Sequence, residues 1–229
     1  MKILCTICAR KGSEGLKGKN YKKLHGVPLI DYTIDQALRI KEINNIIISV
    51  DNYELKKRKN NKITYLSRPK SLSGNKIGKV KVIRHALKYS EKTLKKNFDL
   101  ILDLDVTSPL RNISDIKNSI KMIKKNRNAN NLLTICPARK NPYFNMVEKK
   151  GLYYNLVKSN NKIVKRRQDA PKVFEMNASI YLWKKKYLLK SDKLFSKKTV
   201  FYKMPYNRSI DIDSVVDFEL VKILWKLRK

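Results

Sequence analysis

A glycine-rich, basic stretch follows the first apolar run of the chain. Residues 9–20 read ARKGSEGLKGKN and come directly after the apolar run at 3–8. The stretch combines three glycines with four basic residues: Gly12, Gly15 and Gly18 with Arg10, Lys11, Lys17 and Lys19. Glycine lets backbone N–H groups approach an anion closely, and basic side chains neutralise its charge. The stretch therefore predicts a phosphate-binding loop, with a solvated turn as the competing interpretation. It matches neither G-x-x-x-x-G-K-[ST] nor G-x-G-x-x-G.

Two aspartates near the C-terminus form a second group of residues that could take part in chemistry. Asp211 and Asp213 are two residues apart, just before an expected helix. Side chains two apart on an extended segment face the same side, and such paired carboxylates suit a hard cation such as Mg²⁺. The alternative is that Asp213 stabilises the helix start, where negative charge is favoured. Both roles can hold together.

Alternating strands and helices must position these residues. Strands are predicted at residues 2–8, 46–50, 63–66, 98–104, 131–136, 174–183 and 199–204. Helices are predicted from Pro28, over 79–96, from near Ser114 to Asn126, and after Ser214, where Asp217 completes a capping-box pattern. The alternation predicts an α/β fold with a mostly parallel sheet and helices on both faces. In such sheets ligands bind beyond the carboxyl ends of the strands, where the glycine-rich stretch begins.

The length of the chain fits one domain, residues 1–229. The segment at about 140–175 differs in character, because it is polar and basic with short strand candidates at 146–148 and 152–157. We interpret this segment as an insertion or arm.

The charge and cysteine content narrow the class of protein. Lys and Arg number 53 against 19 Asp and Glu, a formal charge of +34. A nucleic-acid-binding protein would share this excess, but the lysines are spread over every segment. We therefore favour dispersed surface charge, which also favours an anionic substrate. Cys5, Cys8 and Cys136 indicate no disulfide framework, and no apolar run is long enough to span a bilayer. The sequence predicts a cytoplasmic protein that binds neither nucleic acid nor membrane.

Six blocks of sequence, in order, carry a family resemblance. After the glycine-rich stretch and LHGVPLIDYTI come ISVD at 48–51, RP at 68–69, TSPLR at 107–111, RRQD at 166–169, NASIY at 177–181 and SIDID at 209–213. Together they resemble the acylneuraminate cytidylyltransferases, the CMP-sialic acid synthetases and their relatives that act on legionaminic or pseudaminic acid. The resemblance covers almost the whole chain.

The resemblance implies a fold and a reaction. The fold would be the Rossmann-like sheet of the nucleotide-diphospho-sugar transferases with a small dimerisation arm. The reaction would join CTP to a nine-carbon 2-keto-3-deoxy sugar acid, a nonulosonic acid, giving the CMP-sugar and pyrophosphate with Mg²⁺ or Mn²⁺. Such phosphoryl chemistry needs positioning and charge neutralisation more than covalent help. A homodimer is expected, with the arm reaching into the partner's site.

The resemblance also implies roles for individual residues. The nucleotide would be bound by Ala9, Arg10, Gly12, Ser13, Lys19, Asn20 and Arg68. The sugar would be bound by Asp105, Arg167, Gln168, Asn177, Tyr181 and Phe195. The metal would be held by Asp211 and Asp213, which we count with Arg10 and Lys19 as the catalytic residues. Arg167 could pair with the sugar carboxylate through two parallel bonds. The identity of the general base stays open.

Two departures from the family pattern bear on the substrate. Glu14 stands where the family usually carries a basic residue, and Asp105-Val106 stands where the sialic acid enzymes usually carry Gln-Pro. Asp105 predicts either a different sugar, which favours a legionaminate-like substrate, or a further metal ligand alongside Asp103. The alternatives are a CMP-Kdo-type or other sugar nucleotidyltransferase, a basic nucleic-acid-binding protein, and a non-catalytic relative.

Overall fold

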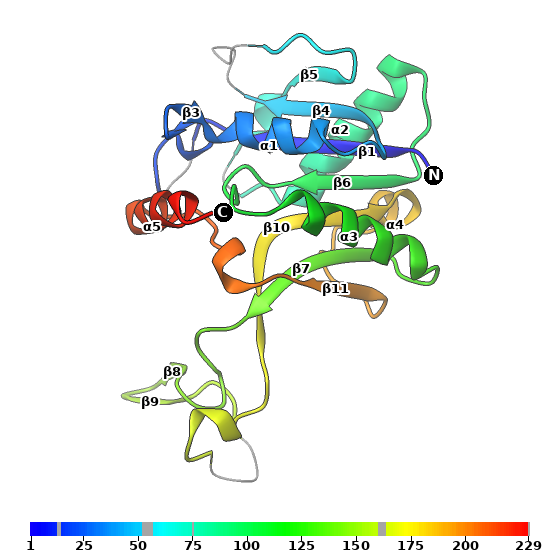
Figure 1. Ribbon diagram of the computed structural model, residues 1–229. Helices are drawn as coiled ribbons and strands as arrows, with labels where there is room; N and C mark the ends of the chain where they lie inside the picture. Colours follow the sequence, from blue (N-terminus) through cyan, green and yellow to red (C-terminus); the bar gives the residue numbers. More distant parts are fainter. Residues whose placement is uncertain (13–14, 52–56, 75, 160–163, 229) are drawn as a thin grey trace.

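A seven-stranded sheet forms the centre of the molecule, and an arm extends away from it (Figure 1). The computed structural model describes residues 1–12, 15–51, 57–74, 76–159 and 164–228. The central strands are β1 (Ile3–Ala9), β4 (Ile43–Val50), β5 (Ile63–Ser67), β6 (Leu100–Leu104), β7 (Asn131–Pro137), β10 (Phe174–Lys184) and β11 (Thr199–Lys203). The helices are α1 (Leu29–Leu38), α2 (Lys79–Leu94), α3 (Ile113–Lys125), α4 (Lys185–Lys190) and α5 (Val215–Lys226).

The order of the strands places the end of β1 at a topological switch point. The order is β11-β7-β10-β6-β1-β4-β5, with β1 parallel to both β4 and β6. Only β10 runs antiparallel to its neighbours β6 and β7 among the paired strands of this sheet. The predicted mostly parallel α/β sheet is confirmed. From β1 the chain continues to β4 on one side, whereas from the neighbouring strand β6 it continues to β7 on the other side. Open α/β sheets bind ligands at such a point.

Alternation along the strands divides the core between the two faces of the sheet. Ile3, Cys5 and Ile7 of β1 pack with α1, α3 and α5, whereas Leu4 packs with α2 and α4 on the other face. All four side chains are fully buried, and Ile3, Leu4 and Ile7 each contribute roughly 1.5–3 kcal/mol through burial. Burial on both faces explains why β1 reads as a continuous apolar run.

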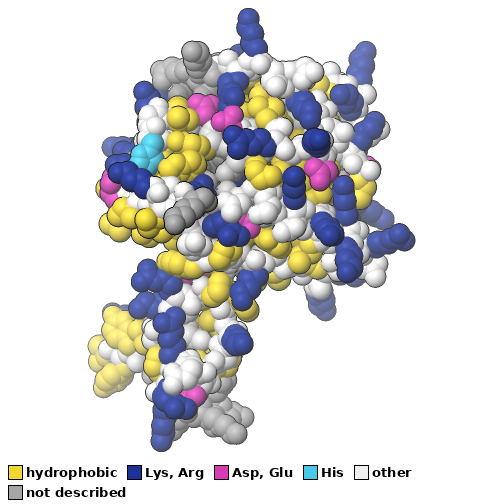
Figure 2. Space-filling view, viewed as in Figure 1, with side chains coloured by type: hydrophobic (Ala, Val, Ile, Leu, Met, Phe, Trp, Pro, Cys, Tyr) yellow, Lys and Arg dark blue, Asp and Glu magenta, His cyan; other side chains and the backbone are white. Residues whose placement is uncertain are grey.

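The arm lies between the end of β7 and the start of β10. Its hairpin pairs β8 (Val147–Lys150) with β9 (Tyr153–Leu156), close to the predicted strands. Every residue of this hairpin is exposed. Figure 2 shows a hydrophobic patch at the outer edge of the arm, and the exposed apolar residues of the hairpin are Val147, Leu152, Tyr153, Tyr154 and Leu156.

The helix ends agree in part with the sequence predictions. Ser214 caps α5 and Asp217 completes the capping box, as predicted. The cap of α3, predicted at or near Ser114, is Asn112, and the Asn112 N–H donates to the Asp115 carboxylate at 2.8 Å. The short helix α4 was not predicted, since six residues carry little periodic signal. Within the described residues, no helix has the length and apolar character needed to cross a membrane.

Candidate active site

A cavity of about 290 Å³ opens beyond the carboxyl end of β1. Residues from the glycine-rich loop, the loop after β5, the start of α2, the loop after β6 and the segment before α5 line it: Cys8, Arg10, Lys19, Asn20, Arg68, Leu72, Gly74, Ile77, Lys79, Val82, Asp105, Thr107 and Asp211. The cavity thus brings together six of the predicted site residues, Arg10, Lys19, Asn20, Arg68, Asp105 and Asp211, from distant parts of the chain.

The glycine-rich loop forms the basic wall of the cavity. Asn20, which is 6% exposed, donates from its Nδ2 to the carbonyl oxygen of Arg10 at 2.9 Å and so ties the two ends of the loop together. Ala9 is buried as the last residue of β1, and Gly12, three residues later, is exposed. Ser13, predicted to bind the nucleotide, lies outside the described residues, as does Glu14.

The loop is packed directly against the aspartate segment. A Cβ built on Gly15 would lie 2.2 Å from the carbonyl oxygen of Asp213, a separation that real Cβ atoms do not reach. The close approach of these two backbones therefore requires glycine. This contact explains one of the three clustered glycines by packing rather than by ligand binding.

We expect Gly15→Ala to destabilise the protein by about 1–3 kcal/mol, because the new methyl group must push the loop away from Asp213. Gly12→Ala is the matched control, since no described atom lies within 4 Å of its Cβ position. The control should change stability by less than about 0.5 kcal/mol. Urea-induced unfolding of both variants measures the difference, and equal stabilities would contradict the contact.

Arg68 is a buried cation on the opposite side of the cavity. Only 8% of this residue is exposed, and its guanidinium donates to the Ser49 Oγ at 3.3 Å and to the Ser49 carbonyl oxygen at 2.9 Å. These bonds orient the side chain from the carboxyl end of β4. A guanidinium fixed in this way can present its remaining N–H groups to a polar ligand in the cavity.

Asp211 is the carboxylate best placed for a cation. Burial raises the pKa of Asp211 to about 6, and the neighbouring charge of Asp105 adds to the rise, although a hydrogen bond from Thr107 opposes it. Its Oδ1 is buried without a hydrogen-bond partner among the described residues. A desolvated carboxylate facing another carboxylate is an arrangement that a cation would stabilise.

Asp213 occupies the rim of the cavity rather than its wall. Its side chain is 74% exposed, and its Oδ1 pairs with the Lys19 Nζ at 2.6 Å. Lys19 also donates to the carbonyl oxygen of Ile212 at 2.8 Å. The two predicted metal ligands therefore have different environments: Asp211 is desolvated in the cavity, and Asp213 is engaged with a basic residue of the loop.

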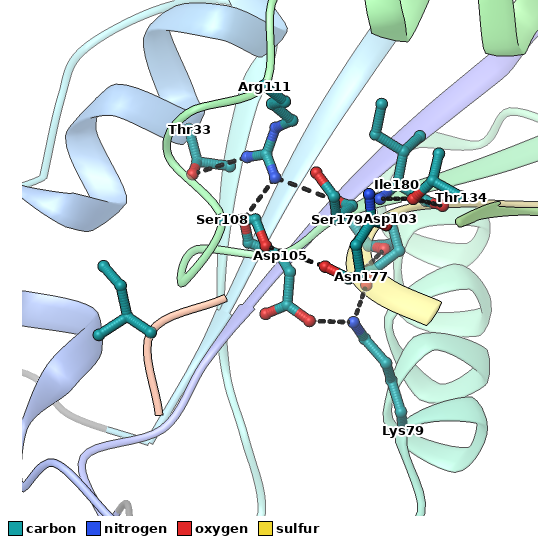
Figure 3. A network of polar contacts seen from close by, with 12 residues as sticks. Thr33, Lys79, Asp103, Asp105, Ser108, Arg111, Thr134, Asn177, Ser179 and Ile180 are labelled. Carbon is teal, nitrogen blue, oxygen red and sulfur yellow. Dashed lines mark hydrogen bonds and ion pairs between the residues drawn. The ribbon is translucent and has the colours of Figure 1, made fainter. Parts of the chain in front are cut away.

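Asp105 belongs to a cluster of charges with Lys79 (Figure 3). The Lys79 Nζ lies 2.9 Å from the Asp103 Oδ2 and 2.5 Å from the Asp105 Oδ2. The same ammonium lies over the Tyr181 ring, 4.0 Å from its centroid. Burial lowers the pKa of Lys79, but Asp103 and Asp105 outweigh burial and raise it well above its usual value. Lys79 is therefore a fixed positive charge in the wall of the cavity.

Arg111 fixes the loop that carries Asp105. This residue is 1% exposed, and its guanidinium donates to the carbonyl oxygens of Asp105 at 2.6 Å and Ser179 at 3.1 Å and to the Thr33 Oγ1 at 2.9 Å (Figure 3). It also donates to the Gln36 Oε1 at 2.8 Å. Four acceptors from α1, β10 and the loop after β6 thus converge on one side chain. The TSPLR block includes Arg111, but its role as a tie between elements had no signal in the sequence.

Asn177 and Tyr181 lie close to this cluster on β10. Asn177 is buried and donates to the Ser209 Oγ at 2.8 Å, while its Oδ1 has no hydrogen-bond partner among the described residues. Burial raises the pKa of Tyr181 to about 12, and Lys79 opposes the rise. Of the two, Tyr181 contacts a cavity-lining residue, namely Lys79. Neither is itself in the cavity wall.

Two predicted sugar-binding residues lie on the arm. Arg167 and Gln168 form the short 3-10 helix η3 (Arg167–Asp169), and Arg167 donates to the carbonyl oxygen of Arg139 at 3.0 Å. The arm points away from the sheet in Figure 1. The structure therefore does not bring Arg167 or Gln168 into the cavity of their own chain.

Phe195 is also remote from the cavity. It precedes β11, whose first residue pairs with Asn131 at the start of β7, and these two strands are parallel. Phe195 thus lies at the edge of the sheet opposite the carboxyl end of β1, where its ring packs 6.1 Å from the Phe201 ring. A larger cavity of about 530 Å³ opens at that edge, but backbone turns and exposed lysines line most of it. The predicted sugar-binding role of Phe195 has no support in this geometry.

Lys79 and Thr107 line the cavity and were not singled out by the sequence. A weak signal existed for Lys79, because a basic residue directly after Gly78 at a helix start runs against the helix dipole. Thr107 belongs to the TSPLR block, and its carbonyl oxygen accepts from the Ile212 N–H at 2.9 Å. This bond joins the loop after β6 to the aspartate segment.

The donor set suits a divalent cation bound together with a ligand. The described residues contain no group of three or more His, Cys, Asp or Glu side chains arranged to hold a metal. Mg²⁺ commonly binds one or two carboxylates together with substrate phosphates and water. Asp211, with its unpartnered buried oxygen, and Asp105, which acts on it electrostatically, fit that mode.

The fold and the site together define a class of protein. A Rossmann-like mixed sheet with a basic, glycine-rich loop at its switch point and carboxylates across the cavity has the nucleotide-diphospho-sugar transferase fold. The particular family follows from the sequence match. The chain belongs to the cytidylyltransferase family, whose model matches residues 4–226. The resemblance seen in the sequence is confirmed.

Individual relatives agree over the full length of the chain. It is 40% identical over 226 residues to post-translational flagellin modification protein B of Campylobacter coli, covering 98% of this chain and 95% of that protein. It is 41% identical over 228 residues to CMP-N,N'-diacetyllegionaminic acid synthase of Campylobacter jejuni, covering 99% and 96%. Identity to an N-acylneuraminate cytidylyltransferase of Escherichia coli is 26%, covering 96% of this chain and 51% of that protein.

A solved structure shows the same fold. CMP:2-keto-3-deoxy-manno-octonic acid synthetase in complex with CTP superposes with a TM-score of 0.67 at 14% identity, covering 99% of both chains. At this identity the comparison concerns the fold alone.

Proposed function

We propose that this protein transfers the CMP group of CTP to a nonulosonic acid of the legionaminic type. The anomeric hydroxyl attacks the α-phosphorus, a new P–O bond forms, the bond to the β-phosphate oxygen breaks, and pyrophosphate leaves as the hydroxyl proton is lost. The observation that supports this best is the cavity at the end of β1, where Arg10, Lys19 and Arg68 face Asp105 and Asp211. Cations for a triphosphate and carboxylates for a metal meet there.

The basic residues have distinct tasks in this proposal. Arg10 and Lys19 bind the triphosphate, which neutralises its charge and aligns the α-phosphate with the attacking hydroxyl. When Lys19 turns to the triphosphate, it releases Asp213, which can then join Asp211. Arg68, held by Ser49, binds the base or ribose.

The metal in this proposal is Mg²⁺ or Mn²⁺, held by Asp211 together with Asp105 or Asp213. A bound divalent ion supplies charge neutralisation on the phosphate oxygens. Before the ion binds, the carboxylates of the chain keep the metal position polar and accessible.

The choice of sugar rests on identity and on one residue. Identity is 41% to the CMP-N,N'-diacetyllegionaminic acid synthase and 27% to a pseudaminic acid cytidylyltransferase of the same species. Asp105 stands at the cavity wall where sialic acid enzymes usually carry Gln, as noted above. A legionaminic-type sugar is therefore the first candidate, and both substrates are anionic, in keeping with the +34 charge. The three free cysteines suit a reducing cytoplasm.

The test is pyrophosphate release with Mg²⁺ and CTP, UTP, ATP or GTP. The sugars compared are N,N'-diacetyllegionaminate, N-acetylneuraminate, pseudaminate and Kdo, and the control is the Asp211→Ala, Asp213→Ala double variant. We expect release with CTP and the legionaminate, absent in the control. Preference for Kdo would favour the CMP-Kdo alternative. Release with none of the combinations would overturn the proposal and favour the alternative of a basic nucleic-acid-binding protein.

We also propose that the protein acts as a homodimer in which each arm completes the partner's site. Two observations support this. The hairpin exposes Leu152, Tyr153 and Tyr154, which are 89%, 74% and 65% exposed. Arg167 lies on the same arm and does not line the cavity of its own chain, so a sugar-binding role requires a second copy.

Mixing two inactive variants tests the shared site. Arg167→Ala and Asp211→Asn should each be inactive alone. Mixed, unfolded together and refolded, they should recover about one quarter of wild-type activity, because each heterodimer has one intact site. Light scattering before mixing reports the dimer. No recovery from two well-folded dimers would show that both residues serve the same chain's site.

A further inference from the structure

Lys79 is a basic residue in the cavity wall that contacts two carboxylates and an aromatic ring. Its ammonium lies within 2.9 Å of Asp103 and 2.5 Å of Asp105, and it stacks on the Tyr181 ring at 4.0 Å. Figure 3 shows the side chain reaching from α2 toward the loop after β6. Three elements of the fold therefore converge on one Nζ atom.

Helix stability does not account for this lysine. Lys79 is the first residue of α2, and the first turn contains no acidic residue. The helix dipole disfavours a positive charge at this end. The side chain is also 27% exposed, so much of its length is removed from water. The reason for a cation here must lie in the groups that it contacts.

Asp103 is the first of these groups. It belongs to the central strand β6 and is 1% exposed. Its Oδ1 accepts from the Thr6 Oγ1 at 2.6 Å, and its Oδ2 faces Lys79. A carboxylate buried in the middle of a sheet needs a paired cation. Lys79 supplies that charge from the cavity side.

Asp105 is the second group, and it faces the site. It lines the cavity together with Asp211, and its charge acts on Asp211. Asp103, Asp105 and Asp211 with Lys79 sum to two negative charges; without Lys79 they would sum to three. Asp105 and Asp211 line the cavity, and Asp103 is buried behind Lys79. Without the ammonium, the three negative charges would attract a bare divalent ion strongly, whereas here the ammonium already pairs with Asp103 and Asp105.

We propose that Lys79 is a positioning residue that fills the cation position between Asp103 and Asp105, so that a divalent ion binds this cavity tightly only together with the nucleotide. The proposal deepens the proposed function and rests on it. The ammonium holds the Asp105 carboxylate in the wall facing Asp211 and prevents metal from accumulating in the empty site. The triphosphate then supplies the metal ligands that the protein alone does not provide. A direct contact from Lys79 to the anionic sugar is the competing role.

Manganese titration of the protein without nucleotide or sugar tests the proposal. Free Mn²⁺ is followed by electron paramagnetic resonance for wild type, Lys79→Met and Lys79→Arg. We expect Lys79→Met to bind Mn²⁺ about tenfold more tightly than wild type. Lys79→Arg should resemble wild type, because it keeps the charge. An unchanged affinity in a folded Lys79→Met protein would overturn the proposal and favour the sugar-contact role.

A second pair of variants keeps the test valid if Lys79→Met does not fold. Asp103→Asn and the double variant Lys79→Met, Asp103→Asn leave no buried charge unpaired at that position. The double variant should bind Mn²⁺ more tightly than Asp103→Asn alone, and equal affinity would also overturn the proposal. Adding CTP to wild type should tighten Mn²⁺ binding. If CTP does not tighten Mn²⁺ binding and no pyrophosphate is released, the proposed function is contradicted. The comparison of wild type with the Lys79 variants in the absence of nucleotide tests the role of Lys79 separately.

Discussion

Asp211→Asn is expected to make the protein more stable at neutral pH while lowering pyrophosphate release by at least about 10²–10³-fold. The pKa of Asp211 is raised from 3.8 to about 6 by burial and then by Asp105. A carboxyl group with a raised pKa in the folded state stabilises the fold below pH 3.8, and this contribution is lost as the pH rises through about 6. Above that pH the charged Asp211 destabilises the metal-free protein.

The expected gain for Asp211→Asn is about 1–3 kcal/mol at pH 7.5, from a shift of roughly two pKa units. The difference between variant and wild type should vanish near pH 4, where both side chains are neutral. Thermal unfolding in EDTA at the two pH values measures the effect, with about 2–4 °C expected for each kcal/mol.

Asp213→Asn is the matched control for this prediction. Its side chain is 74% exposed and its main partner is Lys19, so its removal should not increase stability at pH 7.5. An Asp211→Asn protein no more stable than wild type at pH 7.5 would show that the cavity does not desolvate this carboxylate. In that case the charged Asp211 would not be a source of instability in the folded protein.

Arg111→Leu should cost roughly 3–5 kcal/mol of folding stability, because each buried acceptor left without a donor costs about 1–3 kcal/mol. Leucine fills part of the space but leaves the acceptors of Asp105, Ser179, Thr33 and Gln36 without their donor. Burial lowers the pKa of Arg111 to about 10, with Asp105 opposing the shift, so the guanidinium stays charged at neutral pH.

Arg166→Leu makes the same chemical change at an exposed position. Arg166 pairs with Asp169 at 2.8 Å, and the side chains are 68% and 41% exposed. Its loss should cost less than about 1 kcal/mol. Guanidinium-induced unfolding of the two variants gives the comparison. Similar costs would mean that the convergence of four acceptors on Arg111 contributes little to the fold.

The local features of this fold could be predicted from the sequence, and the reason is their short range. The apolar run of β1, the Pro28 helix start and the Ser214–Asp217 cap each depend on residues within a few positions. The antiparallel direction of β10 could not be predicted in this way. It depends on pairing with β6 and β7, which lie far away in the sequence.

The same difference between short-range signals and long-range contacts explains which site residues could be predicted from the sequence. Six predicted residues meet in one cavity beyond the carboxyl ends of the parallel strands. Arg10, Arg68 and Asp105 directly follow β1, β5 and β6. The other three come from connecting segments: Lys19 and Asn20 from the end of the glycine-rich loop, and Asp211 from the segment between β11 and α5. Phe195 was assigned by family resemblance alone, and the register of β11 places it at the opposite edge. Lys79 was missed because its partners lie 24 and 26 positions later, on another element.

The central position of β1 has a consequence for the synthesis of the protein on the ribosome. The first strand to be made lies between β4 and β6, and its Thr6 bonds to Asp103, 97 residues later. At elongation rates of about 5–20 residues per second, roughly 5–20 s pass between the synthesis of β1 and that of β6. During that time the apolar residues of β1 lack the partner strand β6. The nascent chain is therefore exposed to aggregation early, and α1 and β4, which emerge first, must shield β1 until the sheet can close around it.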